Sequence, residues 1–128
     1  MPRPRVFALA LFALVGACTS HQDQLERAEL HYRAARYEHA LTNLEDLEPD
    51  LGRLDDAERV RYHFVRGMTH ARLQQREHAR HWLALTREIS ADTTVLSNDA
   101  VASMRRILAE TENAPTPVAT ADAGVTPR

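Results

Sequence analysis

The chain has very few of the residues that cross-link small domains or interrupt helices. Its 128 residues include a single cysteine, Cys18, so no disulfide can form within the chain. Between residues 22 and 112 the only glycines are Gly52 and Gly67, and the only proline is Pro49. A domain in this region therefore depends on packing for its stability, and the scarcity of helix breakers favours α-helices.

Signatures of catalysis and of nucleic-acid binding are also missing. The sequence has no glycine-rich phosphate loop, no Gly-x-Ser-x-Gly elbow and no thiol apart from Cys18. Lysine is absent, and the 16 basic residues are outnumbered by 18 acidic residues, which gives a net charge of −2. A charge this small does not indicate a nucleic-acid partner. We expect a protein that is not an enzyme and needs no dissociable cofactor.

The longest apolar run is too short to cross a membrane as a helix. It covers Val6 to Val15. At about 1.5 Å per residue this run spans only about half of a hydrocarbon core that is about 30 Å thick. Arg3 and Arg5 precede it and small residues follow it, which is the order of parts in a secretory signal. We therefore expect residues 1–17 to be a signal peptide.

The residues that end this segment, Leu14-Val15-Gly16-Ala17-Cys18, resemble the lipobox of bacterial lipoproteins. The resemblance implies cleavage after Ala17, a diacylglycerol thioether on the Cys18 sulfur, and acylation of the new amine by a fatty acid such as palmitate. Burial of acyl chains contributes roughly 0.8 kcal/mol per CH₂, and two chains give stable anchoring. The alternative is ordinary cleavage at the same small residues, which would leave Cys18 as a free thiol.

Residues 22–112 are rich in Ala, Leu, Arg and Glu and predict one all-α domain. Amphipathic spacing predicts four helices in two pairs, with Pro49 to Leu54 as the loop between the pairs. Asp55 or Asp56 can cap the third helix, and Glu58 suits a capping box. The predicted apolar stripes are Leu25, Ala28, Tyr32 and Ala35; Ala40, Leu41, Leu44 and Leu47; Val60, Phe64, Gly67 and Ala71; and Ala79, Trp82, Leu83, Thr86 and Ile89.

A fifth helix and a tail complete the expected organisation. Ser97 or Asn98 can cap this helix, which places Val101, Met104 and Leu108 on one side. Residues 18–21 form a lipidated N-terminus and a short linker. Residues 113–128 are rich in Pro, Ala and Thr and have no apolar periodicity. We expect this tail to be disordered.

The chain repeats part of its own pattern with an offset of 39 residues. Small residues on two facing helices, with an aliphatic residue four positions after one of them, are what closely packed antiparallel helices require. The matched positions are Glu38-His39-Ala40 with Glu77-His78-Ala79, Ala28 with Gly67, His31 with His70, Arg33 with Arg72, and Leu44 with Leu83.

This pattern is similar to that of tetratricopeptide repeat proteins, whose units are helix-turn-helix pairs of about 34 residues. The resemblance covers residues 22–90. It implies two helix pairs, a fifth helix that acts as a C-terminal capping helix, and a concave surface lined by the first helix of each pair. A generic five-helix bundle is the alternative, because an independent solenoid needs about three repeats.

Under this resemblance, exposed positions of the first helices are the candidate partner-binding residues. Arg33 and Arg72 are repeat-equivalent. Two guanidiniums beside Tyr32 and Met68 suit a carboxylate that lies next to an apolar side chain. Alternatively, both arginines are solvated or pair with Glu29 and neighbouring acids. The full set of candidates is Gln22, Glu29, Tyr32 and Arg33 from the first pair, and Arg61, Met68 and Arg72 from the second.

Seven histidines raise the alternative of a metal site. His78 and His81 share one face of a helix, and His70 or His63 is a candidate third ligand. The two-histidine order of zinc peptidases, with its inserted glutamate, is absent, and the 39-residue repeat by itself accounts for two pairs of histidines. We therefore expect no metal site.

The lipid anchor and the helical repeats together predict a membrane-anchored adaptor that binds a protein or peptide partner. Short repeat lipoproteins of this kind resemble accessory factors of envelope assembly, secretion or pilus complexes. Thr19 stands where inner-membrane lipoproteins often have aspartate, which favours the outer membrane, facing the periplasm. Two alternatives remain: a structural homo-oligomer whose open repeat ends pair, and a histidine-rich periplasmic carrier of a metal or another ligand.

Overall fold

A computed structural model describes residues 20–113 of the chain. The predicted signal peptide, Cys18 and residues 114–128 of the predicted tail lie outside the described residues. Within residues 20–113, no helix is long and apolar enough to cross a membrane. The elements are the α-helices α1 (His21–Arg33), α2 (Tyr37–Leu47), α3 (Asp56–Arg72), α4 (Arg76–Ile89) and α5 (Asn98–Glu112), with a 3₁₀ helix, η1 (Glu48–Arg53), between α2 and α3.

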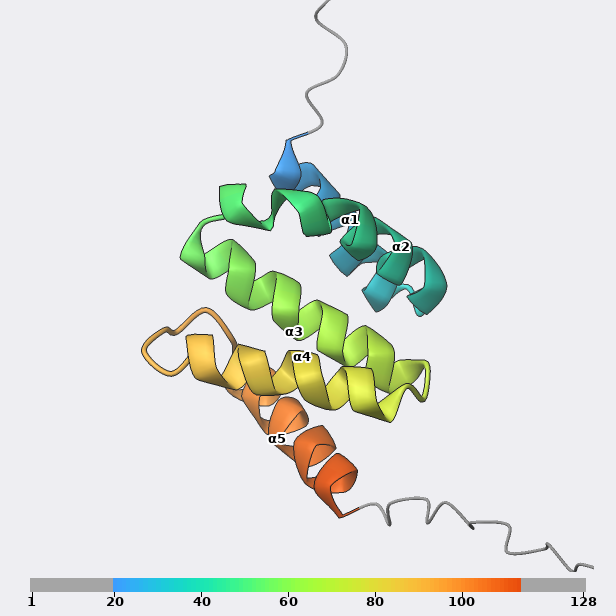
Figure 1. Cartoon of the computed structure of the whole chain (residues 1–128), viewed down its shortest axis with the longest axis vertical. Helices are drawn as coiled ribbons and strands as arrows, with labels where there is room; N and C mark the ends of the chain where they lie inside the picture. Colours follow the sequence, from blue (N-terminus) through green and yellow to red (C-terminus); the bar gives the residue numbers. More distant parts are fainter. Residues whose placement is uncertain (1–19, 114–128) are drawn as a thin grey trace, which may run out of the picture.

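The helices form two antiparallel hairpins, and the described part of the chain is all-α, as predicted. Helices α1 and α2 make the first hairpin, α3 and α4 make the second, and α5 packs against α4 (Figure 1). Helix α3 is central, because it also contacts α1, α2 and α5. The predicted loop at residues 49–54 is largely the 3₁₀ helix η1.

Side-chain caps explain where three of the helices begin. The Asp55 carboxylate accepts from the Glu58 amide at 2.8 Å, and the Glu58 carboxylate accepts from the Asp55 amide at 2.9 Å. This capping box confirms the predicted start of α3. Ser20 and Asp23 form a second box, so α1 begins at His21, one residue before the predicted boundary. Ser97 caps α5 by accepting from the Ala100 amide.

The 39-residue offset is visible in the backbone of the two hairpin turns. Ala35 and Gln74, which are repeat-equivalent, have φ angles of 57° and 61°. The amide of Arg36 donates to the His31 carbonyl at 2.9 Å, and Gln75 donates to His70 at the same distance. The two turns therefore share a left-handed residue at the same repeat position and the same backbone hydrogen bond. The prediction that Ala35 lies on the apolar face of the first helix was wrong, because this exposed residue forms the turn itself.

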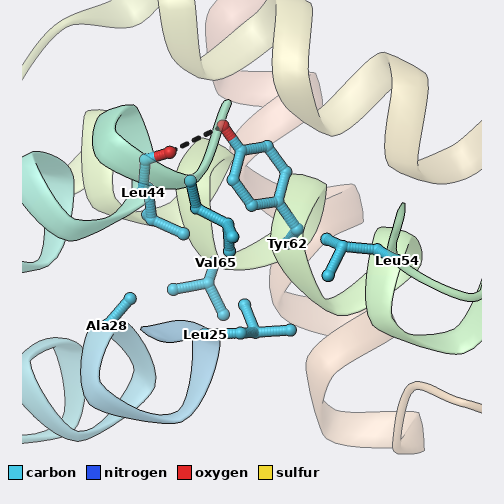
Figure 2. Close-up of a cluster of buried hydrophobic side chains, with 7 residues drawn as sticks. Leu25, Ala28, Leu44, Leu54, Tyr62 and Val65 are labelled. Atoms are coloured by element: carbon cyan, nitrogen blue, oxygen red, sulfur yellow. Dashed lines mark hydrogen bonds between the residues drawn. The ribbon is translucent and has the colours of Figure 1, made fainter. Parts of the chain in front are cut away.

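The core consists of two clusters of buried side chains, and α3 contributes to both. A first cluster joins Leu25 and Ala28 of α1 to Leu44 of α2 and to Tyr62 and Val65 of α3 (Figure 2). The Tyr62 hydroxyl donates to the Leu44 carbonyl at 3.0 Å. A second cluster, under α5, consists of Met68, Leu83, Met104 and Leu108. Ile89, which was predicted in the apolar stripe of the fourth helix, is 42% exposed and lies outside both clusters.

Candidate functional site

A groove with a volume of about 760 Å³ lies where α3, α5 and the first residues of α4 meet. Its apolar lining includes Met68 and Ala71 of α3 and Ile107 of α5. Tyr37, the first residue of α2, also lines it. We call this surface the α3/α5 groove. Of the predicted partner-binding residues, it contains Met68 and Arg72.

The charged residues of the α3/α5 groove are mostly cations. Arg72, Arg76 and Arg106 line it, and Glu110 is its single acidic residue. Each of the three arginines is exposed. An arginine presents several N–H donors in a planar fork that matches a carboxylate. The groove therefore combines an apolar floor with a cationic rim.

The second hairpin turn sets the positions of Arg72 and Arg76. Arg72 is the last residue of α3, and Arg76 is the first residue of α4. The left-handed conformation of Gln74 reverses the chain between them. Beside Arg72 lies Tyr32, whose interaction with the guanidinium raises the pKa of Arg72. Tyr32 of α1 thus lies close to the groove without being part of its lining.

The repeat resemblance implied that Met68 is an exposed contact residue. In the structure only 4% of it is exposed. It packs with Leu83, Met104 and Leu108 in the core cluster under α5. Part of its side chain also forms the groove floor. Because α5 covers this part of α3, Met68 contributes to stability as well as to the shape of the groove.

Glu29 and Arg61 bind each other rather than lining the α3/α5 groove. The Arg61 Nε donates to Glu29 Oε1 at 2.8 Å, and Nη2 donates to Oε2 at 2.7 Å. This bidentate pair joins α1 to α3, and hydrogen bonding to Glu29 raises the pKa of Arg61. Both residues have a structural partner, so the pair holds the two helices together.

Arg33 and Arg72 occupy different surroundings despite their repeat equivalence. Arg33 is exposed in the last turn of α1 and does not line the α3/α5 groove. Gln22 is likewise exposed outside it, in the first turn of α1. The arginines that the groove brings together with Arg72 are Arg76 and Arg106.

Sequence reasoning missed several groove residues. Tyr37 and Arg76 are repeat-equivalent, so the 39-residue offset contained a signal for both. Arg106, Ile107 and Glu110 belong to α5, which has no counterpart in the repeat alignment. Their place in the groove follows from how α5 packs against α3 and α4.

The histidines form pairs across both hairpins. The rings of His31 and His39 lie 5.5 Å apart, and those of His70 and His78 lie 5.0 Å apart. Burial lowers the pKa of His70, and the charges of His78 and Arg66 act in the same direction. Within residues 20–113, no group of three or more His, Cys, Asp or Glu residues is arranged to hold a metal ion.

Comparison with known proteins gives no further assignment. No protein-family model, no curated protein and no solved structure matches this chain.

Proposed function

We propose that this protein is a membrane-anchored lipoprotein with a tetratricopeptide-repeat-like domain that acts as a protein-binding adaptor. Its partner segment is acidic, carries at least one apolar side chain, and binds in the α3/α5 groove. The anchor is a lipid on Cys18, and the domain faces the periplasm from the outer membrane. The pathway is envelope assembly, secretion or pilus biogenesis.

The recurrence of one hairpin geometry supports the repeat assignment. Both turns place a left-handed residue at the same repeat position, followed by the same backbone hydrogen bond. Ala28, Ala40 and Leu44, like Ala79 and Leu83, are completely buried. This agrees with the close helix approach that the small and aliphatic residues of such a repeat provide.

The cationic rim above an apolar floor is the single observation that carries the proposed binding role. The α3/α5 groove is lined by three arginines and one glutamate, so its net positive charge favours anionic ligands. Charge-assisted hydrogen bonds from guanidinium to carboxylate are about twice as strong as neutral ones. The floor formed by Met68, Ala71 and Ile107 suits an apolar side chain next to that carboxylate.

The start of α1 bears on the proposed anchor. Only Thr19 and Ser20 separate Cys18 from the first helical residue, His21. The three residue steps from Cys18 to His21 reach at most about 11 Å, so lipid on Cys18 would hold the start of α1 close to the bilayer. Mass spectrometry of the membrane-extracted protein should find cleavage after Ala17 and acyl chains on Cys18. An unmodified Cys18 would contradict the anchor.

A crosslinked pull-down from solubilised membranes tests the binding role. We would compare the wild-type protein with Arg72→Glu, which reverses a charge inside the α3/α5 groove. The matched control is Arg33→Glu, which makes the same change at the repeat-equivalent position outside the groove. Both side chains are exposed, so both variants should fold.

We expect a partner that binds the wild type and Arg33→Glu but is lost from Arg72→Glu. A partner retained equally by all three proteins would exclude the α3/α5 groove as its binding site. Loss from both variants would show that recognition depends on overall charge rather than on the groove.

A further inference from the structure

A second groove, of about 550 Å³, lies between α4 and α5. Ala84 and Leu85 of α4 and Leu108 of α5 form its apolar lining. Arginine and glutamate both occur among its charged residues, which include Arg87 and Glu112. We call this surface the α4/α5 groove. It is distinct from the α3/α5 groove and shares no lining residue with it.

In the first repeat, the junction between α2 and α3 corresponds to the junction between α4 and α5. The next helix along the chain, α4, covers this first junction. Arg66 of α3 is only 7% exposed and donates to Glu48, just after α2, at 2.9 Å. The ring of Trp82, in α4, covers the Arg66 guanidinium at 4.1 Å. Arg87 is the repeat equivalent of Glu48, and it lines the α4/α5 groove. Among residues 20–113, no helix follows α5 to cover this second junction.

The outward face of α5 has a pattern that suits pairing with an identical helix. Ala102, Arg105, Ala109 and Glu112 are all exposed. Steps of three and four residues place them in one stripe along the helix. Ala109 allows close approach, and the arginine and glutamate stand two turns apart with opposite charges. Glu112 also lines the α4/α5 groove, so the stripe continues into it.

We propose that a second copy of this chain covers the α4/α5 groove through antiparallel packing of the two α5 helices about a twofold axis. In such a dimer every contact occurs twice, with exchanged roles. An axis between Leu108 and Ala109 places Arg105 opposite the partner's Glu112, and Glu112 opposite the partner's Arg105. Charge complementarity thus selects a second copy, and it fixes the register of the two helices.

The dimer places its interface away from the residues that line the α3/α5 groove. Arg105, Ala109 and Glu112 do not line that groove. Arg106 and Glu110 of α5 line the α3/α5 groove, and both lie outside the proposed stripe. Each copy therefore keeps its own partner-binding groove, and the dimer does not depend on the proposed function.

Native mass spectrometry of the full-length protein released from detergent micelles tests this dimer. Arg105→Glu and Glu112→Arg each place like charges together at both contacts, so the dimer fraction of each variant should be at least tenfold lower than that of the wild type. Mixing the two variants restores opposite charges at both contacts, so a mixed dimer should form. Arg27→Glu, an exposed change on α1, is the control and should dimerise as the wild type does.

Far-ultraviolet circular dichroism of each variant establishes that it is folded. A wild-type protein that stays monomeric at every protein-to-detergent ratio would overturn the proposal. It would also be overturned by single variants that dimerise as well as the wild type, or by a mixture that forms no mixed dimer. Binding of a partner in the α3/α5 groove is measured separately, through Arg72, so either proposal can fail alone.

Discussion

Gly67 lies so close to Leu83 that a β-carbon on Gly67 would be 2.6 Å from the Leu83 Cγ. The same β-carbon would lie 3.1 Å from the Leu83 backbone nitrogen. The branch point of a buried leucine cannot move aside without its neighbours, because Leu83 is completely buried in the core cluster with Met68 and Met104. The contact between Gly67 and Leu83 therefore sets the spacing of α3 and α4.

Replacement of Gly67 by alanine should destabilise the domain. Overpacking of a core lowers the free energy of unfolding by about 1–3 kcal/mol, whereas the higher helix propensity of alanine raises it by about 1 kcal/mol. We expect a net loss of about 1 kcal/mol in the free energy of unfolding, measured by chemical denaturation. Gly52→Ala is the matched control, because nothing lies within 4 Å of its β-carbon position. Equal stability of the two variants would contradict the close approach.

Glycine at the two turn positions should stabilise the protein. Ala35 and Gln74 have positive φ angles, which cost an L-residue roughly 1 kcal/mol and cost glycine little. We expect Ala35→Gly and Gln74→Gly each to raise the free energy of unfolding by about 0.5 kcal/mol. The control is Ala34→Gly, since Ala34 has a φ of −81° and gains nothing from glycine. A loss of stability in both turn variants would show that the turns are formed differently.

Acidification should destabilise the domain through His63 and His70. Burial lowers the pKa of each below its ordinary value of 6.5, and for His63 the nearby Arg66, Arg59 and His81 add to the effect. The unfolded chain therefore binds more protons as the pH falls through 6.5, so stability is highest above this pH and decreases below it. The loss levels off below the folded-state pKa values.

Urea denaturation at a series of pH values measures this effect. His63→Phe keeps an aromatic ring against Trp82, which stacks on His63 at 5.3 Å, and removes the titrating group. The variant should show a shallower decrease on acidification, with the contribution of His70 remaining. A decrease as steep as that of the wild type would exclude His63 as a source of the pH dependence.

The bidentate pair of Glu29 and Arg61 should contribute measurable coupling between α1 and α3. A double-mutant cycle with Glu29→Gln and Arg61→Gln isolates the pair, and we expect about 0.5–1 kcal/mol for this partly buried geometry. The same cycle on Asp56 and Arg59, whose side chains are 86% and 46% exposed, should give a smaller value. A coupling of zero for Glu29 and Arg61 would mean that the pair does not hold the helices together.

Local signals in the sequence were enough to predict the helices and their pairing. Asp55, Glu58 and Ser97 mark helix starts by the chemistry of their side chains, which needs no tertiary information. The offset that aligns Ala28 with Gly67 likewise predicted the two hairpins. Spacing along one helix predicts a single buried face, however, and α3 has neighbours on several sides. Tyr62 was therefore not part of the apolar stripe predicted for α3, although it is buried in the structure.

The candidate site was only partly predictable for a similar reason. Arg72 was found through the repeat, since its position recurs as Arg33. Arg106 and Glu110 reach the α3/α5 groove because α5 packs against α4 and α3, and α5 is not a repeat of either earlier unit. Similarly, the burial of Met68 depends partly on α5, whose Met104 and Leu108 pack in the same cluster. Which residues meet there depends on the register of α5 against α3, which no local pattern specifies.

Site-specific photo-crosslinking in intact cells tests the binding role of the α3/α5 groove, because it identifies the proteins that contact this groove. A photoreactive residue replaces Ser103, which lines the groove, or Ala57, which is exposed on α3 outside it. We predict that the Ser103 position forms an adduct with a partner protein, that Arg72→Glu abolishes this adduct, and that the Ala57 position forms none. An adduct that persists with Arg72→Glu, or that forms equally from Ala57, would contradict the claim that the groove is the binding site.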